Sequence, residues 1–363
     1  MPIRFAYGGS QRYRRRCAII TIRGEVDGAA YPLREASVSL NGESARPLYV
    51  EATVDDGIDW TSGYKSTPAE LRCRHQGEFS VEFDADDPAL RPSNEAVVTI
   101  TDAAGQTSRA AVAFTWDPEP PRLPIDLTDL TAVGHIQDIA QAVNGCFDLD
   151  REANVIRSRA PVAPDALLLV GAPGESQEAT YAIRFLEPAG SKWLGCGDFH
   201  AGLTEGVPAR GLKVGWNSAG MAALSPVDGA RAFIAWGDHS ADPREWAIAT
   251  HPARAFTPLR NTLYRVRQRV AIGPQGHRIR WKIWDARHSE PDNWLCDEDT
   301  MKLPTGLPRH PSATFGLFQH MGQPIEWSDI RVRKVTDGAD DLPGAGPHES
   351  RAPFLRRERP GAF

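Results

Sequence analysis

The sequence lacks several features that would place it in a familiar class. Its longest apolar run, residues 166–172, is far shorter than the ~20 residues that a membrane helix needs, so we expect no membrane partner. The N-terminus carries basic residues but no apolar segment with a small-residue cleavage site, so we predict no secretory signal. Lys and Arg number 41 against 47 Asp and Glu, a formal charge of -6. Without a basic excess we expect no nucleic-acid partner.

Cysteine is also scarce. The five cysteines are widely spaced, and no two of them form the CxxC pair on which many zinc sites are built. An odd, scattered set of this kind predicts reduced and mostly buried thiols. Reduced thiols are typical of a cytoplasmic protein, and we predict that location.

Sustained helical periodicity is missing as well. The best helical candidate is residues 126–143, which predicts either a short helix or a connector between domains. The 32 glycines and 29 prolines recur at short intervals, with brief apolar segments between them. This spacing of strand-length segments and turn signals predicts an all-β fold.

The strand-like segments fall into two groups. Residues 1–118 carry several of them, with a hairpin-type turn at Asn41-Gly42, and the spacing favours an immunoglobulin-like sandwich. A proline-rich stretch then predicts a stiff linker at 119–125. Residues 126–336 hold ten or more strand candidates, which fit a two-sheet jelly roll that carries the ligand site. By composition, residues 337–363 form a Gly-, Pro- and charge-rich tail.

One predicted hairpin has two contrasting faces. Residues 263–272 and 277–285 flank a four-residue loop, and closing it places Ile272 opposite His277. The opposed pairs on one face are then Arg265 with Trp284, Arg267 with Lys282, and Arg269 with Arg280, whereas the other face is mainly apolar. Opposed like charges destabilise a bare hairpin. Two interpretations of the basic face stay open. It is an outer face whose cations pair with protein carboxylates, or it lines a groove in which guanidinium groups bind a sugar.

The C-terminal segment FGLFQHMGQPIEWSDIRVR, residues 315–333, resembles the closing strands of concanavalin-like jelly rolls, most of all those of the 3-keto-disaccharide hydrolase type. In that type a GLQ-H-G turn precedes a strand with an NIRV-like run. The hairpin before it also resembles laminin-G-like sandwiches. The resemblance implies a sugar-handling jelly roll and places His320 at the family's histidine position. It makes Asp329 a candidate ligand for a structural calcium ion, and no other cofactor is expected.

Tryptophan is concentrated toward the C-terminus, with eight of the ten residues between positions 193 and 327. Indole rings stack on the C–H faces of sugars, while sugar hydroxyls need planar polar partners. We therefore predict a Trp-lined concave groove, and we assign Trp281 and Trp327 to the core. The predicted substrate-binding residues are Asp198, His200, Trp216, Trp236, Trp246, Arg265, Arg267, Arg280, Lys282 and Trp284.

Acidic and histidine side chains in loops supply candidates for catalysis. Paired carboxylates can act as general acid and base in glycoside cleavage, and a histidine beside an acid can move protons near neutral pH. The candidate catalytic residues are Asp238, His239, Glu245 and His320. For each of them, turn chemistry or a surface ion pair is the alternative role.

These patterns lead to one function with two alternatives. The main prediction is cleavage of a glycosidic bond in an oligo- or polysaccharide, with acidic sugars bound better than neutral ones. The alternatives are a non-catalytic, lectin-like carbohydrate-binding protein and a structural or assembly protein.

Overall fold

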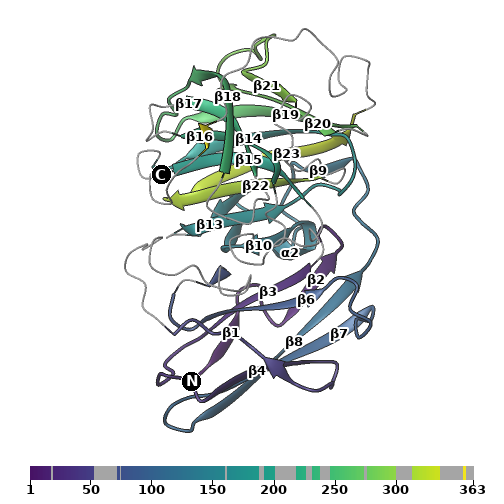
Figure 1. Cartoon of the computed structure of the whole chain (residues 1–363), viewed down its shortest axis with the longest axis vertical. Helices are drawn as coiled ribbons and strands as arrows, with labels where there is room; N and C mark the ends of the chain where they lie inside the picture. The colour runs from purple at the N-terminus through teal and green to yellow at the C-terminus, as the bar shows by residue number, and fades with distance from the viewer. Residues whose placement is uncertain are drawn as a thin grey trace.

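The computed structural model describes residues 1–17, 19–52, 72–73, 75–159, 162–187, 192–200, 218–225, 231–237, 246–273, 276–299, 313–335 and 355–356, some strand residues by backbone alone. Strands dominate these residues, which confirms the all-β prediction. They form two sandwiches, the N-terminal one at the bottom of Figure 1 and the second above it. No helix in the described part of the chain is long and apolar enough to cross a membrane.

The N-terminal sandwich packs a three-stranded sheet, in the order β1-β3-β6, against a five-stranded sheet, in the order β2-β8-β7-β4-β5. Strands β2 and β8 pair in parallel, and the other neighbours pair antiparallel. The rings of Phe83 and Phe114, one from each sheet, stack at 5.9 Å within the shared core. The strands are β1 (Ile3–Phe5), β2 (Ser10–Arg14), β3 (Ile19–Val26), β4 (Glu35–Leu40), β5 (Arg46–Pro47), β6 (Glu78–Asp84), β7 (Ser93–Thr101) and β8 (Thr107–Asp117). The immunoglobulin-like assignment and the domain boundaries stay predictions.

The turn after β4 has the geometry that its sequence demands. Asn41 and Gly42 have φ angles of 53° and 81°, and the Glu43 N–H donates to the Leu40 carbonyl at 2.9 Å. Two consecutive residues with positive φ define a type I′ turn, whose twist matches that of the strands it joins. The side-chain amide of Asn41 also donates to the Ala89 carbonyl at 2.9 Å. The predicted Asn-Gly turn is therefore confirmed.

The second sandwich consists of two antiparallel sheets. The first, called the β22 sheet, has the order β10-β13-β22-β15-β16-β17-β18-β24. Its strands are β10 (Gln141–Asn144), β13 (Val162–Leu169), β15 (Lys192–His200), β16 (Ser218–Ser225), β17 (Arg231–Gly237), β18 (Trp246–Ala255), β22 (Ala313–Gly322) and β24 (Leu355–Arg356). Through β24, residues of the predicted tail reach the edge of this sheet beside β18.

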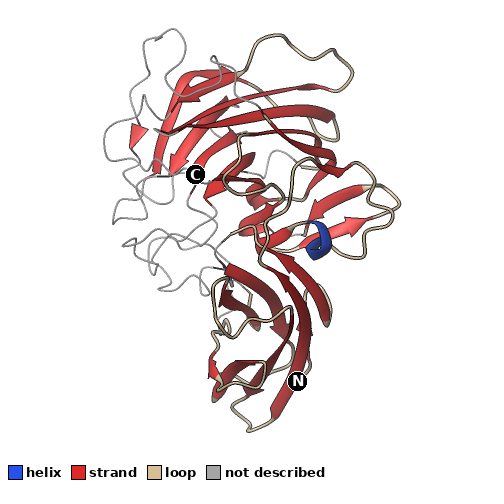
Figure 2. Ribbon diagram, turned by 90° about the vertical axis from the view of Figure 1, so that its right-hand side faces the viewer, coloured by secondary structure: helices blue, strands red, loops and turns tan. Residues whose placement is uncertain are grey.

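The other sheet, called the β19 sheet, has the order β11-β12-β23-β14-β19-β20-β21, with β9 also paired to β23. Its strands are β9 (Ile125–Leu127), β11 (Phe147–Asp150), β12 (Val155–Ser158), β14 (Gln177–Phe185), β19 (Leu263–Gly273), β20 (Gly276–Asp285), β21 (Cys296–Asp299) and β23 (Ile325–Lys334). One core cluster takes buried side chains from both sheets, and the rings of Tyr181 and Phe315 meet across it at 5.8 Å. The two sheets therefore lie face to face, as Figure 2 shows from the side.

The predicted helical region is mostly not helical. Residues 126–143 contain one short helix, α2 (Ile136–Ile139), between β9 and β10. Asp126 and Asp129 each accept a hydrogen bond from the backbone N–H two residues on, at 3.0 and 2.9 Å. Such local bonds compete with the helical pattern, so the apolar spacing produces no longer helix.

Buried hydrogen bonds join the two sandwiches. Gln137 donates to the Tyr13 hydroxyl at 3.1 Å, and Gln141 donates to the Ile19 carbonyl at 2.7 Å. Tyr7, near the N-terminus, belongs to the core of the second sandwich, and its hydroxyl accepts from the Phe147 N–H at 3.1 Å. Because buried polar groups without partners are costly, this interface stabilises one docked arrangement.

Candidate functional site

The β19–β20 hairpin has the predicted register. Arg265 pairs with Trp284, Arg267 with Lys282, Arg269 with Arg280, and Ile272 with His277. The alternate side chains of both strands, Val266, Val270, Ile279, Trp281 and Ile283, are buried in the core of the second sandwich. The basic face therefore lies on the outside of the β19 sheet, because alternate residues of a strand point to opposite faces.

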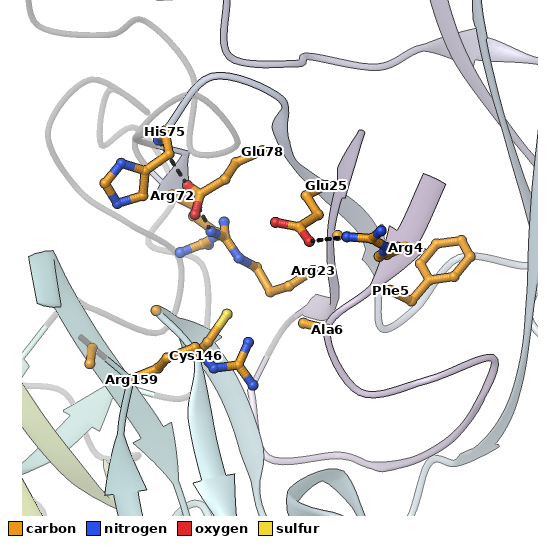
Figure 3. A pocket seen from close by; sticks show the side chains of 13 residues that line it. Arg4, Phe5, Ala6, Arg23, Glu25, Arg72, His75, Glu78, Cys146 and Arg159 are labelled. Atoms are coloured by element: carbon orange, nitrogen blue, oxygen red, sulfur yellow. Dashed lines mark hydrogen bonds and ion pairs between the residues drawn. The ribbon is translucent and has the colours of Figure 1, made fainter. Parts of the chain in front are cut away.

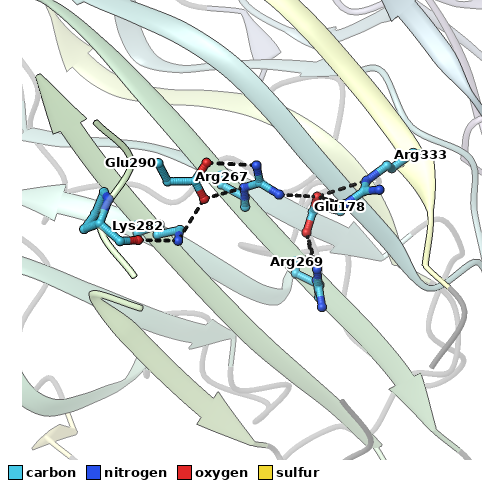
Figure 4. A network of polar contacts seen from close by, with 7 residues as sticks. Glu178, Arg267, Arg269, Lys282, Glu290 and Arg333 are labelled. Carbon is cyan, nitrogen blue, oxygen red and sulfur yellow. Dashed lines mark hydrogen bonds and ion pairs between the residues drawn. The ribbon is translucent and has the colours of Figure 1, made fainter. Parts of the chain in front are cut away.

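The arginines of the outer face stand in rows that run across the strands. The first row reads Arg333, Glu178, Arg269, Arg280 and Asp297, from β23 through β14, β19 and β20 to β21. Glu178 thus has an arginine as its register partner on both sides. Its carboxylate lies 2.6 Å from Arg269 and 2.6 Å from Arg333, and Arg267 of the next row lies at 2.9 Å (Figure 4).

Glu178 is the electrostatic centre of this face. Its side chain is fully buried, and burial alone would raise the pKa of a carboxyl group. Hydrogen bonds from Arg333 and Arg269, together with the charges of Arg269 and Arg267, outweigh that effect and hold the pKa of Glu178 below its ordinary value. The carboxylate is consequently charged at neutral pH and offsets the repulsion between the arginines.

A loop returns over the second row of the hairpin. Glu290, in this loop, lies 2.8 Å from both Arg267 and Lys282, and Lys282 also donates to the Pro291 carbonyl at 2.6 Å (Figure 4). The ring of Trp294 lies 5.0 Å from the Lys282 ammonium group and 5.2 Å from the Arg280 guanidinium. The cations at the centre of the face are therefore engaged by protein carboxylates and an indole ring, as the first reading of the hairpin required.

The third row brings an aromatic, a cationic and an acidic side chain together. Arg265 on β19 is the partner of Trp284 on β20, and on its other side it faces the small Ala182 of β14. Because Ala182 has only a methyl group, the Arg265 side chain reaches past it to Asp329 on β23, at 2.7 Å. The side chains of Arg265 and Asp329 remain 40% and 34% exposed, and Trp284 is half-buried.

Asp329 has an unusual backbone conformation at an irregular point of the sheet. Its φ angle is 51°, a left-handed conformation that costs a non-glycine residue about 1 kcal/mol, and the pairing of β14 with β23 shifts register at this point. The resulting bulge directs Asp329 toward Arg265. The candidate calcium role fits poorly, because a guanidinium group already neutralises this carboxylate. Among the described residues no cluster of three or more metal-ligating side chains occurs.

The β22 sheet offers less open surface where its side chains are described. Leu168 and Leu317 face the shared core, and their neighbours Leu167 and Phe318, which point to the opposite side, are buried as well. Both faces of the sheet are thus covered along β13 and β22. Within the second sandwich, the outer face that the described side chains leave open is that of the β19 sheet.

The remaining predicted site residues are placed only in part. Trp281 and Trp327 are 2% and 1% exposed, which confirms their assignment to the core. Trp216, Asp238, His239 and Glu245 lie outside the described residues. For a further set the backbone lies in strands of the β22 sheet but the side chains are outside the description: Asp198, His200, Trp236, Trp246 and His320. The Trp-lined groove and the catalytic residues stay predictions.

Sequence reasoning missed the acids that neutralise the hairpin. The candidate residues include neither Glu178 nor Glu290. For Glu178, a Glu in an otherwise apolar strand segment is a signal of a charge that needs a partner. Glu178 lies 89 residues from Arg267 in the chain and meets it through strand order, whereas Glu290 lies 23 residues away and meets it through the loop after β20.

No protein-family model matches the chain, and no curated protein matches it either. Three solved structures are similar: the carbohydrate-binding module CBM66 from Bacillus subtilis, the Ca2+/Man3GlcNAc-bound exoplasmic/lumenal domain of VIP36, and the seed lectin of Lotus tetragonolobus. Their TM-scores are 0.36, 0.33 and 0.34, at 11%, 13% and 8% identity. The matches cover 54%, 55% and 55% of this chain and 96%, 85% and 94% of theirs. A likeness this loose carries no argument about the ligand.

Proposed function

We propose that this protein binds saccharides without cleaving them, and that Trp284, Arg265 and Asp329 form the binding site. The observation that carries the proposal is the third row of the β19 sheet, where Arg265 is the strand partner of Trp284 and contacts Asp329, and all three side chains remain partly exposed. A pyranose ring would lie on the indole through its C–H face. Arg265 would donate hydrogen bonds to its hydroxyl oxygens, and the Asp329 carboxylate would accept hydrogen bonds from its hydroxyl groups.

The partner expected at this site is a neutral saccharide. The sequence alone favours an acidic sugar, because the opposed arginines need a negative charge. Glu178 and Glu290 of the protein supply that charge, and Asp329 neutralises Arg265. A carboxylate on the ligand would also approach Asp329, which disfavours it. A neutral sugar meets neither difficulty.

The first experiment is a glycan-array screen, followed by calorimetric titration of the best neutral and acidic saccharides. Trp284→Ala and Arg265→Ala should each weaken binding at least tenfold, since each removes a contact worth about 1.4 kcal/mol or more. Trp284→Phe keeps an aromatic face and should retain most of the affinity. Arg12→Ala removes an exposed arginine from the N-terminal sandwich and is the matched control. Unchanged affinity in both Trp284→Ala and Arg265→Ala would contradict the proposal.

Glycosidic cleavage remains the competing prediction. Its acid and base candidates, Asp238, His239, Glu245 and His320, contribute no described side-chain geometry. Product analysis of the bound saccharides after long incubation separates the two functions. Products that vanish in Glu245→Gln and Asp238→Asn, with binding retained, would establish cleavage. Intact saccharides would support binding alone.

A further inference from the structure

A pocket of about 360 Å³ lies between the two sandwiches. The N-terminal sandwich contributes residues around β1, β3 and β6, and the second sandwich contributes the turn between β10 and β11 and residues near β12 and β13. Its charged lining consists of Arg4, Arg23, Arg72, Arg159, Glu25 and Glu78 (Figure 3).

The lining holds four guanidinium groups and two carboxylates, but Arg72 pairs with Glu82 behind the wall and also donates to Asn144. Arg159 uses two of its nitrogens on a single oxygen of Asp148, and Arg4 has carboxylates no closer than 3.8 Å. Asp148 is not part of the pocket wall. Arg4 and Arg23 therefore keep only long contacts with carboxylates, of 3.5 Å or more.

Arg23 is the most deeply placed of these cations. Its side chain is 4% exposed, yet its nearest carboxylate oxygen, on Glu78, is 3.5 Å away. Its other contacts among the described residues are the sulfur atoms of Cys73, at 3.9 Å, and Cys146. Its Nε has no hydrogen-bond partner among the described residues. A buried guanidinium normally has shorter and more numerous hydrogen bonds, because leaving donors unmade is costly.

The neighbouring thiol does not supply the missing negative charge. Cys146 lies between Arg23 and Arg159 in Figure 3. Burial raises the pKa of Cys146 in spite of the two guanidinium groups, so the thiol stays neutral at neutral pH.

We propose that this pocket binds a small oxyanion, a carboxylate or a phosphate group, held by Arg23, Arg159 and Arg4. The planar guanidinium groups are suited to two parallel hydrogen bonds with such a group. Both sandwiches line the pocket, so a bound oxyanion stabilises their docked arrangement by mass action. The site is separate from the third row of the β19 sheet, and it does not depend on saccharide binding.

Two probes distinguish the sources of the oxyanion: inorganic phosphate and malonate, each titrated by calorimetry against a chloride background of equal ionic strength. We expect saturable binding of at least one probe. Arg159→Gln and Arg4→Gln should each weaken that binding at least tenfold, because each removes a guanidinium group from the pocket. Both side chains are partly exposed, so we expect the fold to tolerate the substitutions. Arg12→Gln is the matched control and should bind as the wild type does.

The buried Arg23→Gln variant serves as a second test. If it folds, as judged by its circular dichroism, it should not bind the probe measurably. The proposal is overturned if neither probe saturates the wild-type protein, or if Arg159→Gln and Arg4→Gln bind as tightly as Arg12→Gln does. Saccharide binding measured in the same variants should not change, which keeps the two sites distinguishable.

Discussion

Replacing Glu178 by glutamine tests the electrostatic account of the β19 sheet most directly. The Glu178 carboxylate is fully buried and contacts the guanidinium groups of Arg267, Arg269 and Arg333. Glutamine has nearly the same shape and keeps one acceptor oxygen, but it carries no charge. The variant therefore leaves three like charges close together without their counter-charge.

The size of the effect follows from burial. Removing one partner of a buried ion pair costs about 3–5 kcal/mol. Arg267 and Arg269 remain 28% and 22% exposed and Arg333 remains 60% exposed, so water solvates part of the charge that is left behind. We therefore expect Glu178→Gln to lower the free energy of unfolding by about 2–3 kcal/mol at pH 7. The melting temperature should fall by about 5 °C.

The effect should also depend on pH. The pKa of Glu178 is lower in the folded protein than its unfolded value of about 4.3. The contribution of the Glu178 carboxylate to the free energy of unfolding is thus fully present above the unfolded pKa. It is lost as the pH falls through the folded pKa. Urea denaturation of both proteins, followed by tryptophan fluorescence from neutral to acid pH, measures this. The difference in unfolding free energy should shrink toward the acid end.

Glu290→Gln is the matched control. Its carboxylate also contacts two cations, but it is 33% exposed, so the loss should be about 1 kcal/mol or less. The reasoning is refuted if Glu178→Gln is as stable as the wild type at pH 7. A destabilisation that is the same at acid and neutral pH would also refute it.

Two further predictions concern the N-terminal part. At the turn after β4, Asn41→Ala should be less stable than Asn41→Gly by about 1 kcal/mol, because only alanine pays for the positive φ; equal urea midpoints would contradict this. Tyr7→Phe leaves the buried Phe147 N–H without its acceptor and should cost about 1–2 kcal/mol in the same assay. Tyr31→Phe is its control, since the Tyr31 hydroxyl has no hydrogen-bond partner among the described residues. An equal loss of stability in Tyr31→Phe would show that the Tyr7–Phe147 hydrogen bond does not stabilise the interface.

Local patterns in the sequence predicted much of the fold. The Asn41-Gly42 turn and the register of the β19–β20 hairpin are properties of short segments, because turn chemistry and the alternation of apolar side chains act over a few residues. The same alternation placed Trp281 and Trp327 in the core. Helical spacing in residues 126–143 predicted a short helix or a connector, and the structure has one short helix there, α2, between β9 and β10.

Only the residues of the candidate site that lie on the hairpin could be predicted from the sequence. Arg265 and Trp284 were paired from the sequence, but Asp329 was considered as a calcium ligand. Its contact with Arg265 depends on β14 lying between β19 and β23, and on the small side chain of Ala182 there. Neither strand order nor a bulge at positive φ can be read from a single strand segment.

Local patterns in the chain set the strands, their turns and a hairpin with one apolar and one basic face, since these features depend on residues close in sequence. These patterns leave open whether protein carboxylates or a sugar engage the basic face. The packing of strands and loops answers that question, because it brings Glu178 to Arg267 over 89 residues of chain and Glu290 to the same arginine over 23. Charge neutralisation depends on distance in space, and strand order rather than local pattern sets that distance.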